Sequence, residues 1–349
     1  MKKVIVVIAI ICLLCTSLML LASCDKKQSE PYVDPHPLSN PNATAETKAL
    51  YNYLCEQYKH KLISGQQESD WMDDRDYEFN YIYSKTGKYP AMRGLDFIND
   101  NFTDVVTRAK EWHNKGGIVT ICWHCSNQFD KGYTESQNTE FTEEQWDKVL
   151  TKGTPENIAF MQGMDKAAPS LKELQNAGIP VLWRPFHEFD GWWFWWSKGG
   201  DSETKPEHFK KLWQMMYDHY TYDLKLNNLI WVLGYSEWSS ITHPENYYPG
   251  DKYCDIVGAD SYQTSYEDAE ERLYEPMYEI VGDRKPLILH ETSFIPSVES
   301  FKEVPWGAFL TWHTEWLIND DNTDEHLYDI YNSDYVITLD EIPDIYAGL

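Results

Sequence analysis

The stretch Gly178-Ile-Pro-Val-Leu-Trp-Arg-Pro-Phe-His-Glu188 joins an apolar segment to a polar end. Its apolar part is continuous rather than alternating, which is typical of a parallel strand that is covered on both faces. Its last five residues include Arg184, His187 and Glu188, and Glu188 closes the run. Parallel strands of α/β proteins present their functional side chains at their carboxyl ends. The stretch therefore predicts an α/β fold with a site at the strand ends.

Seven further runs of the same kind alternate with helical stretches along the chain. They cover residues 61–65, 89–96, 117–124, 228–234, 254–262, 285–291 and 305–312. Eight strand–helix units in a chain of 349 residues fit a single (β/α)8, or TIM, barrel domain. A doubly wound open sheet is the alternative, but the sequence lacks the glycine-rich phosphate loop of that fold.

Three helices have recognisable limits. Thr154-Pro155 combines an N-cap with proline at the first helical position. The pattern Ser265-x-x-Asp268 predicts the start of a helix that ends before Gly282. The stretch from Pro206 to Leu224 is long and amphipathic, which predicts a helix that covers the sheet.

Six of the eight runs end in a polar or aromatic residue. These residues are Asp96, His124, Glu188, Tyr262, Glu291 and Trp312. In a barrel all of these ends reach the same face, where the active site lies. Glu188 and Glu291 are the two glutamates of the set, and a pair of facing carboxyl groups is what cleavage of a glycosidic bond requires. For each glutamate, a salt bridge that orients a loop is the structural alternative.

The charge balance narrows the range of substrates. The chain has 30 Lys and Arg against 56 Asp and Glu, for a net charge of -26. Such an acidic surface repels phosphate groups, so nucleic acid and anionic substrates are disfavoured. An aromatic content of 15% excludes a disordered chain, and 15 Trp and 24 Tyr offer flat faces for a neutral sugar.

The N-terminus predicts export. Lys2 and Lys3 precede an apolar run from Val4 to Leu21, and Leu21-Ala22-Ser23-Cys24 follows. This sequence resembles a bacterial lipobox, so we expect Cys24 to carry a lipid. An uncleaved membrane anchor and an ordinary cleaved signal are the alternatives.

The expected domain limits follow from this reading. Residues 1–23 are a lipoprotein signal peptide, residues 24–44 a proline-rich tether and residues 45–349 the barrel. We expect the protein in the bacterial cell envelope, attached to the membrane through its N-terminal lipid only. Whether it faces the periplasm or the medium stays open.

The cysteines offer a second candidate chemistry. The segment Cys122-Trp-His-Cys125 has the spacing of a zinc or redox motif, but the sequence contains no second such pair. The segment also ends an apolar strand-like run, which favours small buried thiols. Neither a metal nor an organic cofactor is expected.

The segment Trp183-Arg-Pro-Phe-His-Glu-Phe-Asp-Gly-Trp-Trp-Phe-Trp-Trp196 is similar to the signature of glycoside hydrolase family 26, whose members are mostly β-mannanases. That signature reads Arg-Pro-x-His-Glu-x-x-Gly-x-Trp-Phe-Trp-Trp, and the resemblance extends over residues 45–340. It implies a retaining enzyme in which Glu188 is the acid/base and Glu291 the nucleophile.

The resemblance also implies roles for the neighbouring residues. Arg184 resembles the arginine beneath the nucleophile, and Tyr262 the tyrosine that orients it. His124 resembles a histidine that contacts substrate. The other residues expected at the sugar are His187, Trp193, Phe194 and Trp312. Five consecutive aromatic residues, 192–196, cannot all face a substrate, so we expect most of the others to pack the loop.

The implied function is a retaining β-1,4-mannanase of the mannan endo-1,4-β-mannosidase type. Its expected partners are mannan, galactomannan, glucomannan or manno-oligosaccharides, and a monomer is expected. Thr292-Ser293 after Glu291 and His313 after Trp312 depart from common family patterns, so endo or exo action stays open. A mixed-linkage β-glucanase, a β-xylanase and a non-catalytic glycan-binding surface lipoprotein are the alternatives. Pure binding would have no use for the two glutamates.

Overall fold

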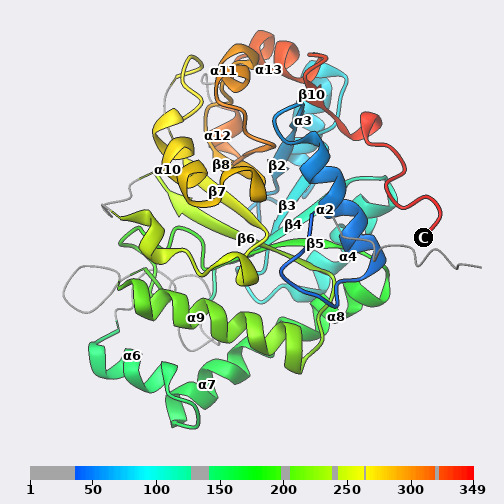
Figure 1. Cartoon of the computed structure of the whole chain (residues 1–349). Coiled ribbons are helices and arrows are strands. Elements are labelled where there is room, and N and C mark those ends of the chain that lie inside the picture. The colour runs from blue at the N-terminus through cyan, green and yellow to red at the C-terminus, as the bar shows by residue number, and fades with distance from the viewer. Residues whose placement is uncertain (1–35, 127–140, 198–204, 238–242, 263–264, 319–321) are drawn as a thin grey trace, which may run out of the picture. The chain divides into compact units, whose positions relative to one another are not determined.

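Eight parallel strands close into a barrel in the computed structural model, with helices around them (Figure 1). Along the chain and around the barrel they are β2 (Gly65–Gln67), β3 (Met92–Asp96), β4 (Ile118–Trp123), β5 (Val181–Pro185), β6 (Leu229–Ser236), β7 (Ile256–Ser261), β8 (Leu287–Thr292) and β9 (Phe309–Thr311). Each strand pairs in parallel with both neighbours, and β9 returns to β2. The predicted (β/α)8 barrel is confirmed.

The structure describes residues 36–126, 141–197, 205–237, 243–262, 265–318 and 322–349. The predicted signal peptide, Cys24 and the tether up to residue 35 lie outside this set. The rest of the predicted tether is part of the folded unit, which begins at His36. Ser39 donates its backbone N–H and its hydroxyl to the two carboxylate oxygens of Asp255, at 2.6 and 3.0 Å. The folded unit therefore starts earlier than residue 45.

The helices lie mainly between consecutive strands. They are α2 (Ala45–Gln57), α3 (Tyr77–Thr86), α4 (Phe102–Asn114), α6 (Glu143–Leu150), α7 (Pro155–Met164), α8 (Ala168–Asn176), α9 (Pro206–Asp218), α10 (Glu271–Val281), α11 (Val298–Glu303), α12 (Glu315–Ile318) and α13 (Asp324–Tyr331). A π-helical turn, His219–Asp223, continues α9 and confirms the long amphipathic helix predicted there. Within the described ranges, no helix combines the length and apolar character that a membrane span requires.

Helix limits follow the predicted caps in one case and depart from them in another. Thr154 caps α7 by accepting the N–H of Asn157, as predicted. The predicted start at Ser265 is wrong, because the Ser265 hydroxyl accepts the N–H of Glu267 in a local turn. Helix α10 begins only after Glu270, whose left-handed backbone redirects the chain and whose carboxylate accepts the Ser261 hydroxyl at 2.6 Å. The predicted end before Gly282 is confirmed.

The first barrel strand also begins later than predicted. The apolar pair of run 61–65 forms β1 (Leu62–Ile63), which pairs with β10 (Val336–Ile337) outside the barrel. The barrel strand is Gly65-Gln-Gln67, whose buried glutamines interrupt the apolar pattern. Gln66 donates its side-chain amide to the backbone oxygens of Gln67 and Trp312, at 2.8 and 3.1 Å.

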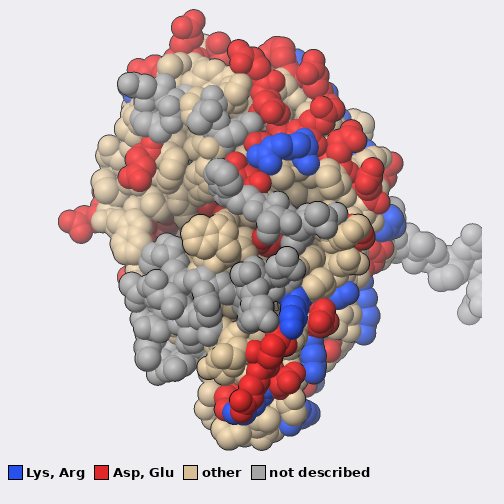
Figure 2. Space-filling view, turned by 90° about the vertical axis from the view of Figure 1, so that its left-hand side faces the viewer, with Lys and Arg blue, Asp and Glu red and all other residues tan. Residues whose placement is uncertain are grey.

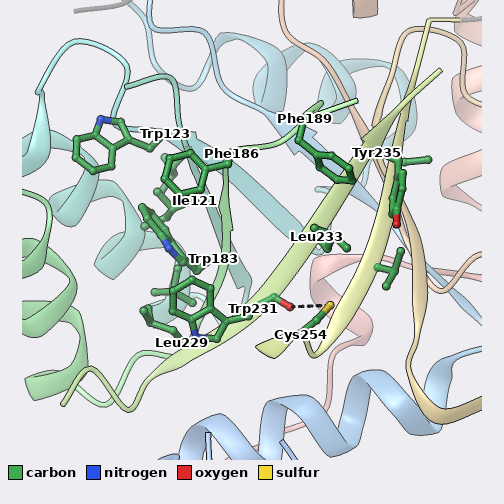
Figure 3. Packing of buried hydrophobic residues seen from close by; sticks show 14 of the residues in the cluster. Ile121, Trp123, Trp183, Phe186, Phe189, Leu229, Trp231, Leu233, Tyr235 and Cys254 are labelled. Atoms are coloured by element: carbon green, nitrogen blue, oxygen red, sulfur yellow. Dashed lines mark hydrogen bonds between the residues drawn. The ribbon is translucent and has the colours of Figure 1, made fainter. Parts of the chain in front are cut away.

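Alternating strand residues build two hydrophobic clusters. Leu182 belongs to one cluster with side chains of the other strands and of α2, and Trp183 to a second cluster that includes residues of the surrounding helices. Figure 3 shows Trp123, Trp183 and Trp231 in this second cluster, with Trp183 between the other two. Trp231 also contacts Trp213 of α9, with ring centroids 5.7 Å apart. Since Trp183 faces the helices, the residue after it, Arg184, faces the barrel interior.

Acidic side chains predominate over basic ones on the face shown in Figure 2. Several of the acidic groups in the described ranges form ion pairs with lysines at the surface, such as Lys85 with Asp324 at 2.8 Å. These exposed pairs contribute little to stability. The surface charge agrees with the exclusion of phosphate-rich ligands.

Candidate active site

A fully buried arginine connects the carboxyl groups at the ends of β7 and β8. Arg184 donates Nη1 to Asp260 Oδ2 and Nη2 to Glu291 Oε2, both at 2.6 Å. Tyr262 donates its hydroxyl to the other oxygen of Glu291. Both oxygens of Glu291 are therefore held, and its carboxylate has a fixed orientation. This placement agrees with the roles expected for Arg184 and Tyr262.

An irregularity in β8 brings Glu291 to the barrel interior. Ala259 pairs with Leu289, whereas the next residue, Asp260, pairs with Glu291, so His290 is an extra residue in β8. A bulge of this kind changes the direction in which the following side chains point. His290 contacts the Thr120 hydroxyl at 2.9 Å, and Glu291 contacts Arg184. Two consecutive residues of β8 therefore both reach groups inside the barrel.

Glu188 lies just beyond β5, in a segment with unusual backbone angles. Phe186 and Glu188 have φ of 50° and 51°, in the left-handed region that residues with side chains rarely adopt. The Glu188 N–H donates to Gly234 O at 2.9 Å. Trp193 Nε1 donates to Glu188 Oε2 at 2.7 Å, which fixes the carboxyl group. Backbone and side chain together aim Glu188 from β5 toward the site.

The surroundings of Glu188 favour its protonated form. Burial raises the pKa of the Glu188 carboxyl group well above 4.5, and the negative charges of Glu291 and Asp260 raise it further. The Trp193 hydrogen bond and the Arg184 cation act in the opposite direction. Two carboxyl groups in different surroundings are the arrangement that separates an acid from a nucleophile.

His124, His187 and Asp96 form a chain next to Glu188. The Asp96 carboxylate contacts His124 Nδ1, and His124 Nε2 lies 3.1 Å from His187 Nε2. Both ring nitrogens of His124 thus have protein partners, and His187 is 0% exposed. The structure places His187 beneath the site, whereas the sequence reading expected it at the sugar.

The five aromatic residues 192–196 differ in their exposure to solvent. Trp193 is half-buried beside Glu188, and Trp192 is 70% exposed. Trp195 and Trp196 are fully buried, which confirms their expected packing role. Phe194 is also buried, with its ring centroid 5.2 Å from that of His124, so it supports the site from below instead of facing solvent.

Trp312 directly follows β9 and is a further aromatic residue at the site. It is half-buried, and its ring centroid lies 6.2 Å from that of His124. The expected position of Trp312 at the site agrees with this contact. Tyr262 packs on Trp316 with centroids 4.8 Å apart, so the tyrosine that holds Glu291 is itself held.

Two groups of side chains have the spacing of a metal site among the described residues. Ligand atoms of His187, Asp260 and Glu291 lie within 4.8 Å of one another, but Arg184 already places its cation on both carboxylates. The second group is Asp96, Cys122 and His124. Burial and the charge of Asp96 raise the pKa of the Cys122 thiol well above its usual value, and the Asp96 carboxylate already contacts His124 Nδ1. Cys122 and Cys125 are buried free thiols, as the sequence favoured.

Sequence reasoning missed Asp260 and did not foresee the contact that Asp96 makes with His124. Asp260 stands two residues before Tyr262, so the period of two along a strand puts both on one face. That signal could have identified Asp260. Asp96 was expected at the barrel mouth only as a polar strand end. Its contact with His124 joins two neighbouring strands, and a single sequence does not show which residues of neighbouring strands lie side by side.

Curated relatives resemble most of this chain. Mannan endo-1,4-beta-mannosidase of Thermothelomyces thermophilus is 32% identical over 325 residues, covering 87% of this chain and 63% of the relative. The enzyme of the same name from Bacillus subtilis strain 168 is 31% identical and covers 81% of this chain and 84% of the relative. The chain spans 50–63% of the length of the first four curated relatives.

Solved structures share the fold. The β-mannanase from a symbiotic protist of the termite Reticulitermes speratus, complexed with gluco-manno-oligosaccharide, has a TM-score of 0.78 at 31% identity. The alignment covers 88% of this chain and 97% of that one. GH26A from Muricauda sp. MAR_2010_75 also has a TM-score of 0.78, at 33% identity, with 87% and 99% of the chains covered.

The family model described as "Glycosyl hydrolase family 26" matches residues 39–341. This range includes every strand of the barrel and both glutamates at its mouth. The chain belongs to glycosyl hydrolase family 26.

Proposed function

We propose that this protein is a retaining β-1,4-mannanase with Glu188 as acid/base and Glu291 as nucleophile. The observation that carries the proposal is the contrast between the two carboxyl groups. Arg184 and Tyr262 donate to the two oxygens of Glu291 and hold its carboxyl group in one orientation for attack. The pKa of Glu188 is raised by burial and by the charge of Glu291, which keeps its proton available.

The reaction proceeds in two displacements. Glu291 attacks the anomeric carbon while Glu188 protonates the leaving oxygen, and a covalent glycosyl ester forms on Glu291. Formation of the ester removes the negative charge that raises the pKa of Glu188. Glu188 then accepts a proton from water, which attacks the anomeric carbon and releases the sugar with retained configuration. Asp260 keeps Arg184 in place through both steps by its 2.6 Å bond.

Mannan is the proposed polymer because of the relatives. Two curated relatives are named mannan endo-1,4-beta-mannosidase, and a solved relative binds a gluco-manno-oligosaccharide. The proposed substrates are mannan, galactomannan, glucomannan and their oligosaccharides. Mannose differs from glucose by its axial 2-hydroxyl group, so selectivity depends on protein groups near that position.

A reducing-sugar assay on galactomannan, glucomannan, lichenan and xylan tests the substrate. We expect the highest kcat/KM on the mannan-containing polymers. A higher value on lichenan or xylan would refute the assignment, and no release from any polymer by a folded protein would refute catalysis.

Azide rescue tests the two roles separately. In Glu188→Ala, an aryl β-mannoside with a good leaving group still forms the covalent intermediate, which then accumulates because water lacks its base. Azide needs no base, so it should restore turnover and give the β-glycosyl azide; the assistance lost is typically ~10²–10⁴-fold. Glu291→Ala should not be rescued to this product. A β-azide from Glu291→Ala would show that the roles are reversed.

We also propose that Cys24 carries a lipid that attaches the protein to the bacterial cell envelope. Lys2, Lys3, the apolar run and Leu-Ala-Ser-Cys24 support this proposal. Cells grown with radioactive palmitate should label the wild-type protein and not Cys24→Ala. Equal labelling of the two proteins would refute the lipid anchor.

A further inference from the structure

We propose that Asp96 is a positioning residue for the acid/base, which acts on Glu188 through His124 and His187. The inference rests on the proposed function, because it concerns how the proton donor of that reaction is held. Asp96 itself lies at the end of β3 and is 3% exposed. It therefore acts from beneath the site.

The contacts run without a gap from β3 to the residue before Glu188. Asp96 Oδ1 accepts the backbone N–H of His124 at 3.2 Å, and Asp96 Oδ2 contacts His124 Nδ1. The rings of His124 and His187 meet edge to face with centroids 4.5 Å apart, and their Nε2 atoms are 3.1 Å apart. Phe194 packs on both rings, which leaves them little freedom to turn.

Burial fixes the direction of these hydrogen bonds. His187 Nδ1 is buried and has no hydrogen-bond partner among the residues that the structure describes, so a proton on that atom would be an unsatisfied donor. His187 therefore carries its proton on Nε2 and donates it to His124 Nε2. His124 then carries its proton on Nδ1 and donates it to the Asp96 carboxylate. The hydrogen bonds therefore run in one direction, from His187 through His124 to Asp96.

This arrangement supports Glu188 in two ways. His187 lies between Phe186 and Glu188, whose left-handed backbone angles require outside support. The ring is fixed by His124, and the His187 carbonyl accepts Trp196 Nε1 at 2.7 Å. In addition, burial lowers the pKa of His187 and keeps its ring neutral, so His187 adds no positive charge that would favour loss of the proton of Glu188.

Asp96→Asn tests the inference because it keeps the size of the side chain. The asparagine side chain has one accepting oxygen for two donors, the backbone N–H and the Nδ1–H of His124. The backbone N–H can only donate, so the amide oxygen must face it. The amide NH2 therefore faces His124 Nδ1, which moves the His124 proton to Nε2, against the proton of His187. We expect nitrogen-15 spectra of the histidine rings to show this tautomer change.

The kinetic test compares two leaving groups. We expect kcat/KM of Asp96→Asn to fall by at least ~10-fold on mannotetraose, which needs general acid assistance, and by less than ~3-fold on 2,4-dinitrophenyl β-mannobioside, which does not. A role limited to fold or sugar binding would lower both values equally. If Asp96→Asn fails to fold, His124→Phe breaks the same chain within its aromatic surroundings and should give the same unequal loss.

Asp70→Asn is the matched control. Asp70 is a buried carboxyl group whose pKa is raised to about 7 by burial and by the charges of Asp96 and Glu68. It accepts Asn101 Nδ2 at 2.8 Å and lies outside the histidine chain. In Asp70→Asn, the ratio of kcat/KM on mannotetraose to kcat/KM on 2,4-dinitrophenyl β-mannobioside should stay at the wild-type level. A wild-type ratio in Asp96→Asn would refute the inference, whereas a wild-type protein inactive on both substrates would refute the proposed function itself.

Discussion

Replacement of Glu188 by glutamine should stabilise the fold, and the gain should grow with pH. In the unfolded chain this carboxyl group ionises near 4.5, whereas in the folded protein its pKa is well above that value. Between the two values the folded state holds a proton that the unfolded state has lost, so the wild-type protein loses stability as pH rises. One such group changes the free energy of unfolding by at most about 1.4 kcal/mol per pH unit.

Glutamine removes this dependence and keeps the shape of the site. It is always neutral, and its side-chain oxygen can still accept the Trp193 N–H. Below pH 4.5 the two proteins should have nearly equal stability, because Glu188 is then protonated in both states. From there to the pKa of the folded protein, the difference in favour of Glu188→Gln should widen and then level off. The same variant should lose activity, as expected where a functional group lowers stability.

Urea unfolding followed by tryptophan fluorescence, at intervals from pH 4 to pH 9, measures the difference directly. Glu299→Gln is the control, because Glu299 is exposed in the first turn of α11. Its difference from wild type should not widen with pH. A constant difference for Glu188→Gln, or a loss of stability at high pH, would show that the site does not favour the protonated acid.

Three other substitutions probe the same site. Tyr262→Phe removes a charge-assisted hydrogen bond worth ~1.5–3 kcal/mol, so kcat should fall by about 10- to 100-fold; an unchanged kcat in steady-state assays would contradict this. Arg184→Met leaves two buried carboxylates without their cation and should cost about 3–5 kcal/mol in urea unfolding. Lys148→Met, from an exposed pair, should cost far less, and equal losses would contradict the inferred burial effect. Trp193→Phe removes a hydrogen bond that lowers the pKa of Glu188, so the alkaline limb of kcat/KM should move to higher pH, and a move to lower pH would reverse the inferred sign.

The strands could be predicted from the sequence where their buried residues are apolar. Seven of the eight barrel strands lie within predicted runs or overlap them broadly, because both faces of a parallel strand are covered. The exception is Gly65–Gln67, where buried glutamines satisfy their amides through contacts made only in the closed barrel. A pattern based on apolar residues cannot detect such a strand.

The sequence predicts most residues of the site, but few of the contacts between them. Glu188 and Glu291 were identified as strand-end glutamates and by family resemblance, and both lie at the barrel mouth. The bulge at His290 and the left-handed backbone at Glu188 aim these side chains, and neither leaves a sequence pattern. Burial of His187 and Phe194 depends on packing among several strands, which single-sequence reasoning does not reach.

The closure of the barrel has a consequence for how the molecule opens. Strands β3 and β4 are joined over five residue pairs, whereas β2 and β9 share one, Gln66 with Thr311. Short pairings have the lowest free energy of local opening, so amide hydrogen exchange should be fastest along this seam. Outside the barrel, β1, which comes just before β2 in the sequence, pairs with β10, which follows β9, so a second pairing links the segments on either side of the seam. Since Trp312 directly follows β9, fluctuations of the seam would move one wall of the sugar site while the glutamates stay in place.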